Sequence, residues 1–261
     1  MERIKQRLQR GELVLAAGVG RLAHHNLIQI IGLHGGFQAI WIDLEHGSLS
    51  IEGLEVATLA ARSVGLDNFV RLAPTDYALV TRCLESGAGG VMAAQIASAA
   101  QAEQFVQWAK FAPRGRRGLN TSGWDARFAS LPVAEFCEKA NRDTLVAIQI
   151  ETLGALDQCD QIAAIDGVDL LFVGPADLSQ SLGVTGEFFH SKCLEAMDRV
   201  AEACRKHEKH WGAVCVSPEH AKQMIQRGCR LLSITNDVRL VHAGLDAVQQ
   251  LYADCFSAAN S

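Results

Sequence analysis

Residues 144–177, TLVAIQIETLGALDQCDQIAAIDGVDLLFVGPAD, contain the pattern that decides the fold. Two short runs rich in Val, Ile and Leu, Thr144–Ile150 and Asp169–Val173, flank a stretch in which apolar residues have helical spacing, Leu153–Ile162. Short apolar runs bounded by polar or glycine turns are typical of buried parallel strands. The stretch between them is typical of a crossover helix. The sequence therefore predicts a strand–helix–strand unit in this segment.

The same alternation extends over the whole chain and predicts an α/β fold. The predicted strands are Leu13–Ala17, Ala39–Asp43, Phe69–Leu72, Gly90–Ala93, Thr144–Ile150, Asp169–Val173, His210–Val214 and Leu231–Ile234. The predicted helices are His25–Leu33, Ile51–Val64, Tyr77–Ser86, Ser98–Phe111, Leu153–Ile162, Ser191–His207, Pro218–Arg227 and Asp237–Ala253. Eight strands, each followed by a helix, within about 250 residues is the count of a (β/α)8 TIM barrel. We therefore predict a single (β/α)8 barrel domain over residues 1–261.

A doubly wound open sheet is the competing architecture. It requires a glycine-rich phosphate-binding turn after the first strand. Gly18-Val19-Gly20 stands at that place, but no third glycine follows before the next predicted helix. We interpret these glycines as a tight turn, which favours the barrel.

Composition and charge exclude several functional classes. Of the 261 residues, 49% are hydrophobic and 20% are charged, which is too apolar for a disordered chain. The formal net charge of −5 lacks the basic excess typical of nucleic-acid binding. The sequence has no apolar run of the ~18–20 residues that a membrane span needs. We expect a cytoplasmic protein without nucleic-acid or membrane partners, whose eight scattered cysteines are reduced.

Two acidic residues at strand ends are candidate metal ligands. In a barrel, the chemistry lies at the carboxyl ends of the strands. Glu151 and Asp177 follow the ends of consecutive predicted strands, and neighbouring strands lie about 4.8 Å apart. Both carboxylates can therefore reach one cation, and hard oxygen ligands of this kind suit Mg²⁺ or Mn²⁺. The alternative is that Glu151 only begins a loop and that Asp177 caps a helix starting at Leu178.

Arg71 and His46 are further candidates for the chemistry. Arg71 ends an apolar strand, where a buried guanidinium is costly unless it meets an anion. It either binds a substrate carboxylate or a developing oxyanion, or forms an ion pair with Asp43 or Glu45. His46 follows these two acids in the sequence. They either orient its imidazole for work as a base, or His46 is only a hydrogen-bonded loop residue.

The lysines bear on the class of mechanism. An aldolase that forms a Schiff base needs a lysine in the barrel mouth. None of the lysines lies within or directly after a predicted strand: Lys5, Lys110, Lys139, Lys192, Lys206, Lys209 and Lys222. A metal, and not a lysine, would then have to stabilise any carbanion.

Five ordered motifs resemble those of a known family. They are WIDLEHG (41–47), FVRLAP (69–74), ESGAGGVMAAQ (85–95), IQIET (148–152) and FVGPADLSQSLG (172–183). Over about residues 10–250 their order and spacing resemble the HpcH/HpaI family of metal-dependent (class II) 2-oxo-acid aldolases, such as 4-hydroxy-2-oxoheptanedioate aldolases. The resemblance implies a barrel of the phosphoenolpyruvate/pyruvate-domain type with carbon–carbon lyase activity. It also implies a homo-oligomer, usually a hexamer, in which a C-terminal helix at about residues 237–256 is exchanged between subunits.

The same resemblance implies how a 2-oxo acid, pyruvate or oxaloacetate, is held. Glu151 and Asp177 would ligate the divalent metal, Mg²⁺ or Mn²⁺. Gln149 would lie beside the metal-bound substrate or its water. The backbone at the start of a helix would hold the substrate carboxylate, through the segment formed by Gly174, Pro175 and Ala176.

For the chemical step, the resemblance implies a pyruvate enolate that attacks an acceptor or leaves it. Arg71 would contact the keto or enolate oxygen of the bound 2-oxo acid. His46, oriented by Asp43, would transfer protons. These three residues are the predicted catalytic set.

The acceptor stays open between an aldehyde and an acyl-CoA. Relatives on this barrel include siderophore-pathway citrate synthases, which condense oxaloacetate with acetyl-CoA. In the family, the loop at residues 118–128 helps to shape the acceptor pocket. Trp124 and the Arg114–Arg117 cluster are interpreted as fitting a larger anionic partner such as coenzyme A, or as a solvated loop or subunit contact. A third hypothesis is a non-catalytic binding protein, against which the intact site residues argue.

Overall fold

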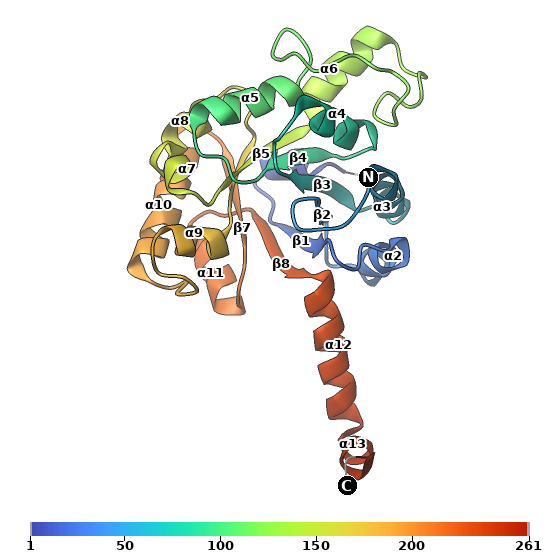
Figure 1. Cartoon of the computed structure of the whole chain (residues 1–261), viewed down its shortest axis with the longest axis vertical. Helices are drawn as coiled ribbons and strands as arrows, with labels where there is room; N and C mark the ends of the chain where they lie inside the picture. The colour runs from blue at the N-terminus through green and yellow to red at the C-terminus, as the bar shows by residue number, and fades with distance from the viewer. Residues whose placement is uncertain (1, 260–261) are drawn as a thin grey trace.

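Eight parallel strands form a closed barrel in the order of the chain (Figure 1). The computed structural model describes residues 2–259. The strands are β1 Val14–Val19, β2 Ala39–Asp43, β3 Asp67–Leu72, β4 Gly90–Ala93, β5 Leu145–Ile150, β6 Leu170–Val173, β7 His210–Val214 and β8 Leu231–Asn236. The barrel closes where β8 pairs with β1. The predicted (β/α)8 fold is confirmed, and the open sheet is excluded.

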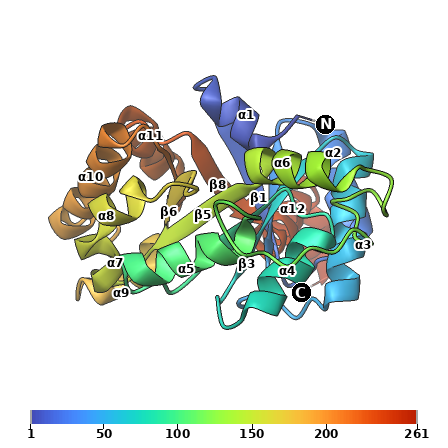
Figure 2. The same ribbon diagram turned by 90° about the horizontal axis from the view of Figure 1, so that it is seen from above.

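Helices surround the barrel and extend beyond it (Figures 1 and 2). They are α1 Ile4–Gln9, α2 His25–His34, α3 Ile51–Ser63, α4 Tyr77–Glu85, α5 Ala99–Ala109, α6 Val133–Asp143, α7 Leu153–Asp157, α8 Cys159–Ala164, α9 Pro175–Ser181, α10 Ser191–Lys206, α11 Pro218–Gln226, α12 Asp237–Leu251 and α13 Ala253–Ala259. The predicted helix Leu153–Ile162 is divided at Gln158 into α7 and α8. Helix α6 was not predicted; its sequence is mostly polar, and Phe136 is its only buried residue.

The strand period explains which side chains reach the mouth of the barrel. Residues two apart on a strand face the same side of the sheet. Trp41, Phe69 and Phe172 form an aromatic layer inside the barrel, with ring centroids 5.5 to 6.3 Å apart. Two residues further along β2 and β3, the inward positions are Asp43 and Arg71. Charged groups therefore lie directly above an apolar floor at the carboxyl end of the barrel.

The amino end of the barrel is closed by α1 (Figure 2). Ile4 and Leu8 of this helix are buried and belong to the same apolar cluster as the aromatic layer. Asp67, at the start of β3, accepts hydrogen bonds from the backbone N–H of Ile4 at 2.7 Å and from Arg3 Nη1 at 2.9 Å. These contacts hold α1 across the amino end of the barrel.

Beyond its first turn, helix α12 does not pack against the barrel that it follows. Figure 1 shows α12 and α13 extending away from the body of the molecule. The apolar side chains of α12 are accordingly exposed: Val238, Val241, Leu245, Val248 and Leu251. In residues 2–259, no helix is both long enough and apolar enough to cross a membrane.

Candidate functional site

Arg71 lies in the mouth between two carboxylates. Its Nε and Nη2 atoms donate to Asp43 at 3.1 and 2.6 Å, and its Nη1 atom lies 3.1 Å from Glu45 Oε2. Its guanidinium also lies over Trp41, with Cζ 4.6 Å from the ring centroid. These contacts confirm the predicted ion pairs. The hydrogen bonds to Asp43 occupy two of the five N–H groups of the guanidinium, so further N–H groups are left for a substrate.

Arg71 affects the pKa of the neighbouring Asp43 carboxyl. Burial raises the pKa of the Asp43 carboxyl, but the hydrogen bonds and charge of Arg71 outweigh burial, and the pKa lies below its ordinary value. Asp43 therefore stays ionised near neutral pH. An ionised Asp43 fixes the orientation of the guanidinium without needing a substrate.

Glu151 is a buried carboxylate directly after β5. Its Oε1 atom accepts hydrogen bonds from the backbone N–H and the Nε2 atom of Gln95, at 2.8 and 3.1 Å, and its Oε2 atom accepts from Gln149 Nε2. Burial raises the pKa of Glu151 to about 7, and the nearby charges of Glu45 and Asp177 act in the same direction. Such a carboxylate is stabilised in its charged form by a nearby cation.

Local structure places Glu151 at this point. Thr152 caps α7 by accepting a hydrogen bond from the backbone N–H of Ala155 at 3.1 Å, so the chain leaves the strand right after Glu151. The Thr152 hydroxyl also donates to the carbonyl of Ile96 at 2.7 Å. This bond ties the β5–α7 loop to the β4–α5 loop, which carries Gln95. The backbone of Gln95 has φ of +54°, a left-handed conformation that turns its amide toward Glu151.

Several oxygen atoms near Glu151 lack partners and fit a hard cation. The Oε1 atom of Gln149 is buried without a hydrogen-bond partner. Within residues 2–259, the Asp177 carboxylate accepts no hydrogen bond. Carboxylate and amide oxygens suit Mg²⁺ or Mn²⁺. Over the described residues, the structure contains no group of three or more His, Cys, Asp or Glu side chains able to hold a metal.

The start of α9 lies against this carboxylate. The helix begins at Pro175, with Gly174 as the preceding cap residue, so the alternative that Asp177 caps a helix starting at Leu178 is wrong. A Cβ atom on Gly174 would lie 2.6 Å from both Gln149 Nε2 and Glu151 Oε2, so any side chain there would displace one of these two groups. Proline has no N–H, and this position therefore cannot donate to a substrate carboxylate through its backbone.

His46 is oriented differently from the expectation. The Oδ1 atom of Asp43 accepts a hydrogen bond from the backbone N–H of His46 at 3.3 Å, so Asp43 fixes the loop and not the imidazole. The carboxylate that faces the ring is Glu45, whose Oε2 atom lies 3.8 Å from His46 Nε2. The side chain of His46 is 62% exposed. Its exposed position suits proton exchange with solvent.

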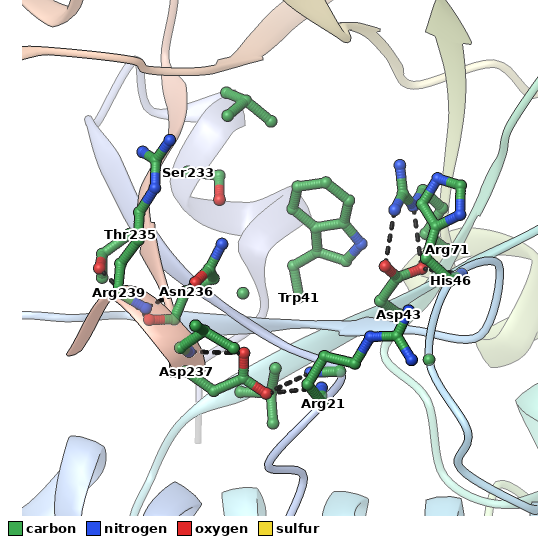
Figure 3. Close-up of a pocket in the computed structure, with 16 residues that line it drawn as sticks. Arg21, Trp41, Asp43, His46, Arg71, Ser233, Thr235, Asn236, Asp237 and Arg239 are labelled. Atoms are coloured by element: carbon green, nitrogen blue, oxygen red, sulfur yellow. Dashed lines mark hydrogen bonds and ion pairs between the residues drawn. The ribbon is translucent and has the colours of Figure 1, made fainter. Parts of the chain in front are cut away.

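A cavity of about 250 Å³ opens beside Arg71, on the side of the mouth formed by β1, β2 and β8 (Figure 3). Its lining includes Trp41, Asp43 and His46. The opposite wall comes from the end of β8 and the start of α12, and contributes Ser233, Thr235, Asn236 and Arg239. Glu151 and Gln149 belong to β5, across the barrel from this wall. Arg71 therefore separates a carboxylate-rich part of the mouth from an open cavity.

Comparison with known proteins identifies the family. The sequence profile of the HpcH/HpaI aldolase/citrate lyase family matches residues 21–243. This chain belongs to the HpcH/HpaI family. It is 34% identical to a 4-hydroxy-4-methyl-2-oxoglutarate aldolase of Hapsidospora irregularis, over 77% of this chain and 75% of that protein. It is 29% identical to a hydroxypyruvate/pyruvate aldolase of Pseudomonas aeruginosa, over 94% of this chain and 90% of that protein.

A solved citrate synthase has the same fold as this HpcH/HpaI chain. The two superpose with a TM-score of 0.87 over 99% of each chain, at 24% sequence identity. At that identity the likeness shows the shared barrel alone. The aldolase names belong to the relatives that are more similar in sequence, so the predicted carbon–carbon lyase of the aldolase class is confirmed.

The loop after α5 lies away from the mouth of its own barrel. The backbone N–H of Trp124 donates to the carbonyl of Glu85, the last residue of α4, at 2.9 Å, and the Arg62 guanidinium lies 4.1 Å from the Trp124 ring centroid. Arg117 forms a buried ion pair with Asp125. These contacts lie near the C-terminal ends of α3 and α4, at the amino end of the strands. None of the described residues of this loop lines the cavity beside Arg71 of its own chain, and its role in shaping the acceptor pocket stays a prediction.

Sequence reasoning missed several residues of the HpcH/HpaI site. Gln95 is the last residue of the motif ESGAGGVMAAQ (85–95), but nothing in the sequence indicates that it binds Glu151. The position of Trp41 follows from the strand period, because it lies two residues before Asp43 on the same face. Arg21 and Arg239 lie in the cavity, and no motif around them marks these positions.

Proposed function

We propose that this chain is a divalent-metal-dependent aldolase that makes or cleaves a carbon–carbon bond through the enolate of a 2-oxo acid such as pyruvate. Buried Glu151, with its pKa raised to about 7 beside Gln149 and Asp177, carries this proposal. Class II aldolases of the HpcH/HpaI family generally depend on a divalent metal. A buried group of oxygen atoms without enough partners is a suitable place for that ion.

We assign Glu151 and Asp177 as the metal ligands, with Gln149 beside the bound substrate or its water. When bound, Mg²⁺ or Mn²⁺ supplies positive charge that stabilises an enolate. Gly174 lies against Glu151, and the backbone around Gly174 and Ala176 is the proposed holder of the substrate carboxylate. The close approach of Gly174 to Glu151 supports this arrangement.

Arg71 is the proposed electrostatic catalyst. In the cleavage direction a base removes the proton of the substrate hydroxyl and the carbon–carbon bond breaks. The electron pair of that bond then stays on the 2-oxo acid fragment as an enolate. The N–H groups of Arg71 that do not bind Asp43 stabilise the enolate oxygen, and Asp43 and Glu45 hold the guanidinium in place beforehand. His46 transfers protons between the site and solvent, and a proton returned to the enolate carbon gives the 2-oxo acid.

The second candidate is a citrate synthase that condenses oxaloacetate with acetyl-CoA. The shared barrel is compatible with it. The residues expected to bind coenzyme A are engaged elsewhere in this chain: Arg114 pairs with Glu103, Arg117 pairs with Asp125, and Trp124 packs against Arg62. An aldehyde or ketone acceptor is therefore favoured.

Exchange of the methyl protons of pyruvate in heavy water tests the proposal. We expect NMR to show exchange that requires Mg²⁺ or Mn²⁺ and that stops with a chelator. The variant Glu151→Ala should lose both exchange and Mn²⁺ binding, whereas Glu138→Ala on α6 serves as the matched control. Absence of exchange with either metal contradicts the aldolase, and oxaloacetate with acetyl-CoA is then the substrate pair to assay.

We also propose that the chain forms a homo-oligomer in which α12, within about residues 237–256, packs against another subunit. The exposed apolar row that includes Val241, Leu245 and Val248 supports this, because such a row is unfavourable in water. Light scattering after size exclusion should give a multiple of the 28.2 kDa chain mass, six by family resemblance. The variant Leu245→Asp should reduce that mass. A wild-type monomer contradicts the assembly.

A further inference from the structure

Two arginines in the cavity beside Arg71 have no partner in the chain. Arg21 lies in the loop between β1 and α2, and Arg239 lies in the first turn of α12. Both line the cavity of about 250 Å³. Within residues 2–259, neither guanidinium forms an ion pair or donates a hydrogen bond. Arg71, the third arginine of the lining, is paired with Asp43.

The acidic residues in the same lining are already occupied. The Oδ2 atom of Asp237 accepts hydrogen bonds from the backbone N–H groups of three successive residues at 2.7 to 2.8 Å: Gly20, Arg21 and Leu22. Its Oδ1 atom accepts from the backbone N–H of Val238 at 2.9 Å. Asp43 is engaged by Arg71. Three guanidinium groups thus face a cavity whose two carboxylates have their own partners, which leaves the cavity positively charged.

The two arginines are placed to bind the far end of a molecule that reacts beside Arg71. A Cβ atom on Gly20 would lie 3.0 Å from Asp43 Cβ, so the loop that carries Arg21 packs directly against the residue that holds Arg71. Figure 3 shows Arg21 extending on the side of Asp43, and Arg239 on the opposite wall with Ser233. This cavity lies on β1, β2 and β8, away from Glu151 on β5.

The cavity has room for a small molecule. Its volume is about 250 Å³, and that space suits an acid of a few carbon atoms. The positive charge selects for an anion, and a carboxylate matches the two-donor edge of a guanidinium.

We propose that Arg21 and Arg239 bind a carboxylate on the acceptor, and so make the enzyme selective for short carbonyl acids. In the cleavage direction they bind the second carboxylate of a 4-hydroxy-2-oxo dicarboxylic acid. This inference rests on the proposed aldolase function. It adds which residues of the enzyme select the acceptor, and which charge on the acceptor they recognise.

The test compares acceptors that differ in charge but not much in size. Pyruvate is condensed with glyoxylate or glycolaldehyde, and with succinic semialdehyde or butanal, and kcat/KM is measured for each acceptor. We expect wild-type enzyme to prefer the anionic member of at least one pair. The double variant Arg21→Gln/Arg239→Gln should lower that anionic-to-neutral ratio by about 10- to 100-fold, mainly through KM. Arg82→Gln, an exposed arginine of α4 outside the cavity lining, is the matched control.

Three results would overturn the inference. One is wild-type enzyme without preference for the anionic acceptors. Another is a double variant that loses the same factor on charged and neutral acceptors. The third is a raised KM for pyruvate in the exchange assay, because the arginines would then bind the donor. Metal-dependent exchange of pyruvate protons by wild-type enzyme tests the aldolase function separately, so a failure of selectivity alone is distinguishable from a failure of the proposed function.

Discussion

Both ends of the barrel contain buried charged groups, but the partners of these groups differ between the two ends. At the amino end, Asp67 is bonded to Arg3 and to the backbone of Ile4, and Lys5 Nζ lies 2.8 Å from Asp169. At the carboxyl end, the burial of Glu151 raises its pKa to about 7, and near it a buried amide oxygen has no partner. The amino end neutralises its charges within the chain. The carboxyl end leaves charges for a ligand, as is typical of the catalytic face of a TIM barrel.

Replacing Glu151 should produce the largest effect, and on activity alone. The variant Glu151→Gln keeps the shape of the side chain but removes the proposed metal ligand. We expect pyruvate proton exchange to fall by about two to three orders of magnitude, while the thermal midpoint of the metal-free protein stays the same or rises, because a buried charge is removed. NMR exchange and thermal unfolding measure the two quantities. A large drop in the midpoint would place Glu151 with the structural charges of the amino end.

The variant Arg71→Lys should come next. Lysine keeps the charge but cannot donate to Asp43 through two atoms while also facing Glu45. We expect kcat/KM to fall by about 100-fold, with a small loss of stability. Steady-state kinetics measures the loss, and Arg82→Lys is the control. Retention of most activity would mean that positive charge alone suffices at this position.

The variant Asp67→Asn tests the opposite end of the same strand. It removes the charge that binds Arg3 and weakens the bond to the Ile4 amide, so α1 loosens from the amino end. Arg3 is partly exposed, which limits the effect to about 1–2 kcal/mol of unfolding free energy. Urea unfolding measures it. The kcat of the folded fraction should be retained, and a loss of kcat comparable to that of Arg71→Lys would contradict the division between the two ends.

The alternation of side chains along the strands predicted, from the sequence, most of this difference between the two ends of the barrel. Polar residues after apolar strands identified Glu151, Arg71 and Asp43, because parallel strands bring their carboxyl ends together. The contacts between loops were not predictable in this way. The left-handed backbone of Gln95 and the exposure of His46 depend on how separate loops pack, and neighbouring sequence does not encode that packing.

The direction in which α12 leaves the barrel could not be predicted from the spacing of its apolar residues either. Its apolar spacing fits packing against the barrel as well as packing against another subunit. The structure shows that α12 leaves its own barrel. Periodicity fixes which face of a helix is buried, but it does not name the surface that buries it.

The smallest expected effect concerns Lys110, a residue at the amino end of the barrel whose pKa is shifted. It tests whether a shifted pKa by itself marks a functional residue. Its Nζ atom is buried and donates to the carbonyls of Asn141 and Thr144, at 2.9 and 2.8 Å. Burial lowers the pKa of Lys110 to about 8. Between pH 8 and about 10.5 the unfolded chain therefore binds more protons at this residue than the folded chain, so the stability of the fold should rise with pH in this window.

The slope of the unfolding free energy against pH that Lys110 contributes is at most about 1.4 kcal/mol per pH unit. The variant Lys110→Met should remove this slope. The control Lys222→Met, at an exposed position, should keep it. Urea unfolding at several values between pH 7 and pH 10 measures the difference. The same slope in both variants would show that Lys110 does not titrate in this range. Lys110 and Glu151 both have shifted pKa values, yet all the hydrogen bonds that Lys110 donates end on carbonyls of its own chain. A shifted pKa therefore marks a functional site in this barrel only where the group also faces unpartnered atoms, as Glu151 does.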